Sequence, residues 1–333
     1  MTLLCFGTRP EWLKIKPLVK LLKKEEAEYN TKMYQLLFTG QHEDLLSDIL
    51  VDERIHILHY SDSRLDNVII NCLMQFPDGD FDSILVQGDT VSAFACALAA
   101  YNRKLKIYYL EAGLRSYNLK HPYPEEGYRQ MISRISDINL CPTELSKENL
   151  DKERVSGKNI VIGNTVLDNL LKYKDNTTYS PTVLVTLHRR ENHHIMDRWF
   201  TEVNKLAKKY DKIDFVLPIH PNPNVKKHKG ILTHVRTVDP LEHDQLLTLL
   251  AKCRLVISDS GGLQEEGSFL NKKVIVCREV TERPEAIETG HLHLCKTPEE
   301  LGELFDTLNE ISYINKDCPY GDGRSSERIV NLL

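Results

Sequence analysis

The sequence predicts an α/β protein with two doubly wound domains, each built on a parallel sheet. Short apolar runs with strand character alternate with amphipathic helical segments almost throughout the 333 residues. Such alternation is typical of βαβ units, in which successive strands run parallel and helices cover the sheet. The alternation stops at a polar stretch, residues 172–182, and then resumes. This pause indicates a linker between two domains, which the chain length also favours.

The first half of the chain carries five predicted strands and the helices between them. The strands are expected at residues 2–6, 32–38, 83–87, 106–110 and 137–140, and helices at 64–76, 91–103 and 125–135. A further helix follows the first strand. Pro10 suits its first position, whereas Pro17 falls inside it and is expected to kink it. We assign residues 1–172 to the N-terminal domain.

The second half repeats the pattern after the linker. Strands are expected at 182–187, 214–219, 234–238, 254–258 and 272–277, and helices at 196–210, 241–252 and 262–270. These elements predict a second doubly wound domain over residues 173–317. The tail, residues 318–333, reads as a glycine-rich turn followed by a terminal helix.

Composition narrows the classes of function. A formal net charge of -5 and a pI near 6.2 argue against a nucleic-acid partner. No apolar run approaches the ~18 residues of a membrane span. The start "MTLLCF" lacks a basic signal-like region, so we expect a cytoplasmic protein with no membrane partner. The eight cysteines form no C-x-x-C pair, which favours buried reduced thiols over zinc ligands or disulfides.

Three acids of the first domain stand where ligands of open α/β sheets bind, at the carboxyl ends of strands. Asp89 follows the third predicted strand, Glu111 follows the fourth, and Glu125 begins the helix after it. Asp89 would also suit the N-cap of the next helix, and Glu125 would offset a helix dipole. Together the three favour acid/base chemistry, because neighbouring carboxylates push their pKa values apart.

Basic and amide side chains after other strands indicate a phosphate-binding site. Arg9 stands beside a helix N-terminus, with Lys14 about one turn further on. His188 is followed by two arginines, which suits a pyrophosphate better than a structural histidine. His220 and Asn222 lie in a proline-stiffened loop after another strand. A surface arginine and lysine on a capped helix remain the plain alternative for Arg9 and Lys14.

The segment "DSGGLQEEG" is the sharpest anion-binding signal. Ser260, Gly261 and Gly262 predict a tight turn whose free amides, with the helix that follows, face phosphate oxygens. Glu265 and Glu266 are expected in the first helical turn. One would complement the helix dipole, and the other would accept hydrogen bonds from ribose hydroxyls.

A set of motifs runs through nearly the whole chain in one order. They are "FGTRPEWLKIKPL", "TGQH", "QGDT", "EAGLR", "PEEGYR", "PTELSKENL", "GNTVLDNL", "HRREN", "HPNPNV", "DSGGLQEEGSFLNKKVIV", "TERPEAIETG" and "PYGDG". Each is weak alone, but the combined set is highly specific. The sequence resembles the non-hydrolysing UDP-N-acetylglucosamine 2-epimerase family.

The resemblance implies a GT-B fold, in which two Rossmann-like domains flank an interdomain cleft and the terminal helix packs back on the N-terminal domain. It implies inversion at C2 of a UDP-N-acetylhexosamine without NAD, another cofactor or an essential metal. A base removes the C2 proton, UDP leaves to give a glycal, and UDP adds back with protonation on the opposite face. The resemblance also implies a homodimer.

The resemblance also assigns roles to the candidate residues. The catalytic set it implies is Asp89, Glu111, Glu125 and His188. The substrate-binding set it implies is Arg9, Lys14, Arg129, His220, Asn222, Ser260, Gly261, Gly262, Glu266 and Arg283. Which carboxylate serves which face of the sugar stays open.

Some residues depart from the family pattern. His193 and His194 follow "HRREN", where the family has Phe-Gly. The stretch "QHED" and Asn71 replace residues that regulated members use for a second UDP-sugar, so we expect no allosteric activation by substrate. "SDINL" is similar to relatives that act on 6-deoxy amino sugars.

Four other functions stay open. A UDP-N-acetyl-6-deoxy-L-hexosamine would undergo the same epimerisation. A GT-B glycosyltransferase would share the UDP site but needs one base and an acceptor groove rather than three clustered acids. A hydrolysing epimerase would release free UDP, and an inactive nucleotide-sugar sensor would lack the acids.

Overall fold

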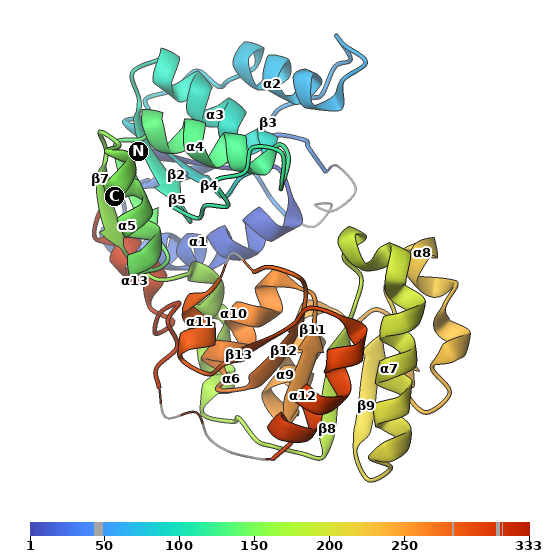
Figure 1. Cartoon of the computed structure of the whole chain (residues 1–333). Coiled ribbons are helices and arrows are strands. Elements are labelled where there is room, and N and C mark those ends of the chain that lie inside the picture. Colours follow the sequence, from blue (N-terminus) through green and yellow to red (C-terminus); the bar gives the residue numbers. More distant parts are fainter. Residues whose placement is uncertain (43–48, 282, 311–313, 315) are drawn as a thin grey trace. The chain divides into compact units, whose positions relative to one another are not determined.

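The computed structural model describes residues 1–42, 49–281, 283–310, 314 and 316–333, and these form two compact units. Unit 1 comprises Met1–Asn169 and Gly321–Leu333, and unit 2 comprises Leu170–Tyr320. Each unit contains one parallel sheet with helices packed on it (Figure 1).

The described part of unit 1 has a seven-stranded parallel sheet in the order β3-β2-β1-β4-β5-β6-β7. The strands are β1 (Thr2–Phe6), β2 (Tyr34–Phe38), β3 (Glu53–Arg54), β4 (Ser83–Gln87), β5 (Lys106–Leu110), β6 (Ile138–Cys141) and β7 (Lys158–Val161). The helices are α1 (Arg9–Tyr29), α2 (Arg64–Met74), α3 (Val91–Asn102), α4 (Glu125–Ile135), α5 (Glu144–Glu153) and α13 (Ser325–Val330). The strand order is of the Rossmann type.

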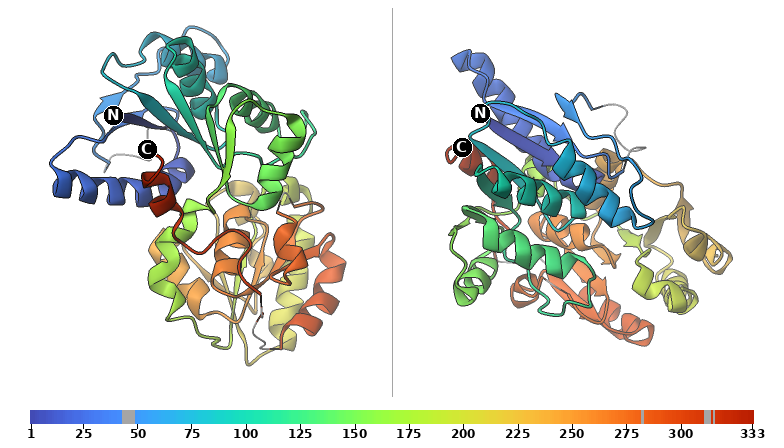
Figure 2. Two further views of the ribbon diagram at one scale, coloured as in Figure 1. Left: turned by 90° about the vertical axis from the view of Figure 1, so that its left-hand side faces the viewer. Right: turned by 90° about the horizontal axis from the view of Figure 1, so that it is seen from above.

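Successive residues of the central strands of unit 1 point to two separate cores. Leu3 and Cys5 of β1 join a core with α2, α3 and α4, whereas Leu4 and Phe6 join a core with α1 and α13. The terminal helix α13 lies beside α1, and both chain termini belong to this unit (Figure 2). The Tyr108 hydroxyl donates to the Leu332 carbonyl at 2.6 Å and ties the tail to β5.

The described part of unit 2 has a six-stranded parallel sheet in the order β10-β9-β8-β11-β12-β13. The strands are β8 (Thr182–Thr186), β9 (Asp214–Pro218), β10 (Arg236–Val238), β11 (Leu255–Ser258), β12 (Lys273–Cys277) and β13 (Leu292–Cys295). The helices are α6 (Leu171–Lys174), α7 (Met196–Lys209), α8 (Pro223–Lys226), α9 (His243–Lys252), α10 (Gly261–Phe269), α11 (Glu285–Glu288) and α12 (Leu301–Leu308). Counted within the unit, this order matches that of unit 1 without its last strand.

The structure differs from the sequence-based expectations at several local points. Helix α1 begins at Arg9, with Thr8 as N-cap and Pro10 as its second residue, and it runs through Pro17 without ending. The predicted linker begins inside the short helix α6. β3, β7 and β13 had no predicted counterpart because they are short edge strands with weak apolar patterns.

Two further expectations concern the state of the cysteines and the presence of membrane-spanning helices. The eight cysteines, all among the described residues, are free thiols, and seven of them are buried. Of the helices that the structure describes, none has the length and apolar character to cross a bilayer.

Candidate active site

Asp89, Glu111 and Glu125 all lie at the carboxyl edge of the unit 1 sheet, after β4, after β5 and at the start of α4. Asp89 is not the cap of α3, because Thr90 takes that position and its hydroxyl accepts from the Ala93 amide at 3.1 Å. Capping therefore does not explain Asp89. The expectation that Asp89 caps the helix was wrong because Asp89 and Thr90 are neighbours and aspartate and threonine are both good N-caps.

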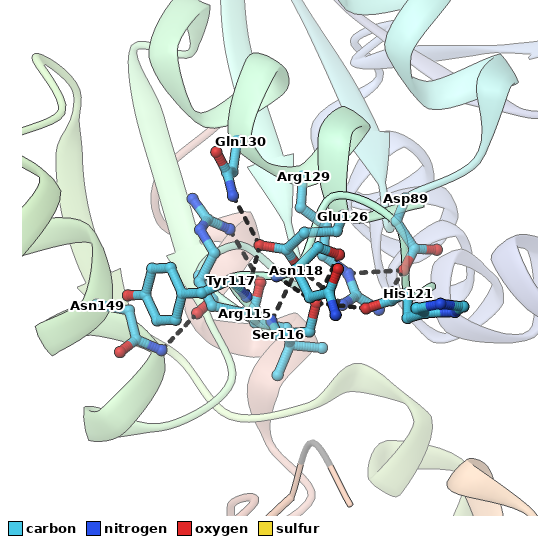
Figure 3. Close-up of polar contacts among 12 residues, drawn as sticks. Asp89, Arg115, Ser116, Tyr117, Asn118, His121, Glu126, Arg129, Gln130 and Asn149 are labelled. Carbon is cyan, nitrogen blue, oxygen red and sulfur yellow. Dashed lines mark hydrogen bonds and ion pairs between the residues drawn. The ribbon is translucent and has the colours of Figure 1, made fainter. Parts of the chain in front are cut away.

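Asp89 is held by Arg129 of α4 (Figure 3). Nε and Nη2 of Arg129 contact the same carboxylate oxygen, Oδ2, at 2.8 and 2.6 Å. Among the described residues no hydrogen bond reaches Oδ1, and the Asp89 side chain is 30% exposed. One oxygen is thus anchored, and the other stays available to a ligand. Arg129 contacts a candidate catalytic acid in this structure, and its role in binding substrate stays a prediction.

Glu111 is held by a second cation in the same unit. Its Oε2 accepts from Lys14 Nζ and from the Gln87 amide. Its backbone has φ 67°, in the left-handed region that non-glycine residues rarely adopt. Strain of this kind at the end of a strand is characteristic of functional sites. Lys14, predicted to bind diphosphate, pairs here with an acid.

Glu125 differs from the other two acids. Its Oε2 is buried and has no hydrogen-bond partner among the described residues. The Arg129 network instead includes its neighbour Glu126, with Arg129 Nη1 at 3.4 Å from Glu126 Oε2. Sequence reasoning overlooked Glu126, since "EE" at a helix start gives no sign of which acid turns inward.

A second overlooked acid, Glu11, links two strand-end loops. Its carboxylate accepts from the Gly7 amide at 3.0 Å and from the Thr90 hydroxyl at 2.6 Å, and the residue is 1% exposed. Burial raises the pKa of Glu11, although these hydrogen bonds oppose the shift. Arg9, two residues earlier, is exposed at the first position of α1.

In unit 2, Asp259 organises the loop that carries His188. Asp259 is fully buried, and its carboxylate accepts from the amides of His188 and Arg189 and from the Asn192 side chain, at 2.9 to 3.1 Å. The His188 ring lies close to it, with Nδ1 3.7 Å from Oδ1. Burial lowers the pKa of His188, and Asp259 only partly offsets this, which favours the neutral imidazole.

His220 stacks on His188, with ring centroids 5.0 Å apart and an interplanar angle of 10°. Burial, and next the neighbouring His188 ring, lower the pKa of His220 as well. The Asn222 amide donates to His220 Nδ1 at 3.1 Å, so the neutral ring carries its proton on Nε2. The Asn222 side chain caps α8 by accepting from the Asn224 amide at 2.9 Å. That contact gives Asn222 a structural role in addition to the predicted binding role.

The Ser-Gly-Gly segment is a helix start and not the predicted tight turn. Ser260 is the N-cap of α10, and Gly261 and Gly262 are its first two residues. A Cβ at Gly261 would lie 3.2 Å from Arg283 Nη1 and 3.3 Å from Arg189 Nη2. Glycine therefore lets two guanidinium groups approach the positive end of a helix, an arrangement that favours a bound anion.

Glu265 and Glu266 lie in the second turn of α10, since the helix begins at Gly261, and not in the first turn as predicted. Glu265 Oε1 accepts from Arg283 Nε at 2.6 Å. Glu266 Oε1 lies 3.2 Å from Nε2 of His243 at the start of α9. The two acids thus have different partners. Glu282 of "TERPE" lies outside the described residues.

Asn71 is part of a ladder of side-chain amides on α2. It is fully buried, and it exchanges hydrogen bonds with the Leu58 backbone at 2.8 and 3.1 Å. Asn67 and Gln75 bond the same extended segment on either side. Asn71 therefore has a structural role here. In "QHED", Glu43 and Asp44 lie outside the described residues.

Comparison with known proteins identifies the family. The family model described as UDP-N-acetylglucosamine 2-epimerase matches residues 25–333. The UDP-N-acetylglucosamine 2-epimerase of Campylobacter jejuni is 38% identical, covering 99% of this chain and 96% of its own length. That of Bacillus subtilis is 37% identical, covering 98% and 93%.

The similar solved structures include members of the same family as the sequence relatives. The UDP-GlcNAc 2-epimerase of Neisseria meningitidis, crystallised with UDP-GlcNAc, superimposes with a TM-score of 0.87 at 35% identity, covering 99% of this chain and 98% of the other. MurG of Acinetobacter baumannii has a TM-score of 0.66 at 12% identity and shares the fold alone, two Rossmann-like units of the GT-B type. The chain therefore belongs to the UDP-N-acetylglucosamine 2-epimerase family, a family of isomerases.

Proposed function

We propose that this protein interconverts UDP-N-acetylglucosamine and its C2 epimer. The observation that carries the proposal is the set of strand-end carboxylates in unit 1, in a chain of this family. Glu111 is paired to Lys14, and among the described residues neither Asp89 Oδ1 nor the buried Glu125 Oε2 has a hydrogen-bond partner. Inversion of a C–H centre needs proton transfer on two faces, so more than one acid/base group is required.

The proposed reaction is an elimination followed by an addition. A base takes the C2 proton, the C2–H electron pair forms the C1–C2 double bond, and the C1–O bond breaks to release UDP. UDP then attacks C1 of the glycal, and an acid delivers a proton to C2 on the opposite face. We assign these transfers to Asp89, Glu111 and Glu125 as a group, without dividing the two faces among them.

Unit 2 is proposed to bind the nucleotide. The start of α10, with Arg189 and Arg283 close to Gly261, offers amides and two cations to a diphosphate. Neutral His188 and His220 would donate hydrogen bonds to phosphate oxygens, and His188 would stabilise charge on the leaving UDP. Glu266 is proposed to accept from the ribose hydroxyls.

Two residues of unit 1, Arg9 and Lys14, are also proposed to contact the diphosphate. Arg9 is at a helix start, where a phosphate is favoured. Lys14 would have to share its ammonium between Glu111 and phosphate. Such sharing would couple departure of UDP to the state of a candidate catalytic acid. The homodimer remains a prediction from the family resemblance.

Proton NMR in D₂O tests the proposal. With UDP-N-acetylglucosamine, the C2 proton signal should disappear while the anomeric signal of a second UDP-sugar grows. A panel with UDP-N-acetyl-6-deoxy-L-hexosamines identifies the preferred sugar. Accumulating free UDP would indicate the hydrolysing reaction. Measurable UDP binding without exchange of any sugar would contradict the proposal and favour a glycosyltransferase or a sensor.

A further inference from the structure

Glu126 is a fully buried carboxylate that the proposed chemistry does not use. Four groups donate to it: the amides of Ser116 and Tyr117 at 2.9 and 3.2 Å, the Gln130 side chain at 2.8 Å, and Arg129 Nη1 at 3.4 Å. Every partner is a donor, so the site is built for an acceptor without a proton. A buried acid with this many donors is costly to replace with a neutral group.

The two backbone donors lie in the segment that joins the candidate acids. This segment leaves β5 through Glu111 and enters α4 at Glu125. Tyr117 has φ 55° and its side chain is exposed, so its own packing does not enforce this conformation. The Glu126 carboxylate binds the amide of Tyr117 and of the residue before it. Glu126 thereby fixes the middle of the segment.

The contact of Glu126 with Arg129 leads on to Asp89. Arg129 is largely buried between the two carboxylates, with Nη1 toward Glu126 and with Nε and Nη2 on Asp89 Oδ2 (Figure 3). Burial alone would lower the pKa of Arg129, but the Asp89 charge and hydrogen bond, helped by Tyr109 and Glu126, raise it. The guanidinium is therefore a fixed cation. Its Nε and Nη2 edge contacts Asp89, and the contact of Nη1 with Glu126 on the other side fixes its orientation.

We propose that Glu126 is a positioning residue for the reaction. It acts through Arg129, which holds Oδ2 of Asp89 and leaves Oδ1 directed at the ligand, and through the loop amides, which hold the Glu111–Glu125 segment. The inference rests on the proposed 2-epimerase function and adds a residue that touches neither substrate nor reacting atoms.

Glu126→Gln is the central test. The amide keeps the shape but directs an N–H₂ group at donors and removes the charge that faces Arg129. We expect kcat for epimerisation to fall roughly 10- to 100-fold, as for a base displaced by a fraction of an ångström. The KM for UDP-N-acetylglucosamine and the Kd for UDP should stay within about threefold, because no group proposed to bind the nucleotide is altered.

Glu153→Gln is the matched control. Glu153 holds another buried arginine of unit 1, Arg115, at 2.7 and 3.0 Å. Arg115 directly precedes Ser116 and also donates to the Ser133 hydroxyl at 3.1 Å, but among the described residues no hydrogen bond or ion pair joins either side chain of this pair to Asp89, to Glu126 or to the Arg129 guanidinium. The variant therefore loosens a similar Arg–Glu pair on the same segment while leaving the contacts of Glu126 with Arg129 and of Arg129 with Asp89 in place. Its kcat should stay within about threefold of the wild type when both variants are assayed well below their melting temperatures.

A double-mutant cycle separates positioning from general damage. If Glu126 acts through Arg129, adding Glu126→Gln to Arg129→Lys should lower kcat by less than threefold beyond the single Arg129→Lys variant. A wild-type kcat for Glu126→Gln would overturn the inference. Losses that multiply in the double variant would overturn the route through Arg129, and a loss in Glu153→Gln equal to that in Glu126→Gln would overturn the positioning role itself. A wild-type protein that leaves the C2 proton in place would overturn the proposed function itself.

Discussion

Unit 1 holds its candidate site residue Asp89 with an arginine, whereas unit 2 holds His188 with a buried aspartate. A second ion pair in each unit shows the same difference between the units. Glu111 is paired with Lys14 in unit 1, and Arg283 is paired with Glu265 in unit 2. Acids proposed to move protons are thus supported by cations, and groups proposed to bind a diphosphate are supported by acids. Both arrangements fix a charged or polar group before the ligand arrives, which is the main requirement for electrostatic stabilisation.

The largest effect in this comparison is expected from Asp89→Asn. An amide cannot accept the C2 proton, so we expect C2 exchange in D₂O to fall about 1,000-fold or more. UDP affinity, measured by calorimetry, should change by less than about threefold because the proposed nucleotide groups are intact. Asp151→Asn, which alters an exposed acid paired with Lys147, is the control. An Asp89→Asn enzyme with near wild-type rate would remove Asp89 from the catalytic set.

A change on the unit 2 side, Asp259→Asn, should affect binding and stability together. The amide N–H₂ would face the backbone N–H groups of His188 and Arg189, leaving buried donors unpaired. We expect a loss of about 2–4 kcal/mol in unfolding free energy and roughly tenfold weaker UDP binding. Thermal unfolding and calorimetry measure the two quantities. Unchanged UDP affinity in a destabilised variant would show that the loop is not part of the nucleotide site.

The sequence was most informative where the signal is local. The strands at Thr2–Phe6, Ser83–Gln87 and Lys106–Leu110 and the helix at Glu125–Ile135 match the predicted ranges. Apolar periodicity and flanking turn residues lie within each of these segments and are enough to define them. β3 was missed because two residues carry no periodicity.

The supporting acids were missed for the opposite reason. Asp259 meets the His188 amide across 71 residues, and Glu11 meets Thr90 across 79. The residues near Asp259 and Glu11 in the sequence do not indicate which distant residue each acid contacts. Glu126 reaches Ser116 across only 10 residues, but two adjacent glutamates at a helix start look alike until the packing of α4 turns one of them inward. Strand-end position therefore predicts that acids gather at the carboxyl edge of the unit 1 sheet, and only the fold reveals the groups that hold them.

The smallest expected effect is an opposite response of the two units to acid. In unit 2, burial lowers the pKa of His188, of His220 and, to about 4, of His291. The unfolded chain therefore binds more protons than unit 2, and the stability of the unit falls as pH drops below about 6.5. In unit 1, burial raises the pKa of Glu11 and Asp168, so these two groups favour proton uptake by the folded unit and add stability as pH falls toward their unfolded values. Burial lowers the pKa of His42 in the same unit, which offsets part of this gain.

Hydrogen exchange at pH 7 and pH 5, corrected for the intrinsic pH dependence of exchange, measures both responses in the intact protein. Protection of β11 and β12 should decrease by about 1–2 kcal/mol, and protection of β1 and β4 should stay constant or increase. His291→Gln tests this explanation directly, because it removes the histidine whose pKa is lowered to about 4. The variant should lose less protection in unit 2 between pH 7 and pH 5, and protection in unit 1 should not change. Equal loss of protection in both units would mean that the charges of the whole chain, and not these buried groups, govern its response to acid.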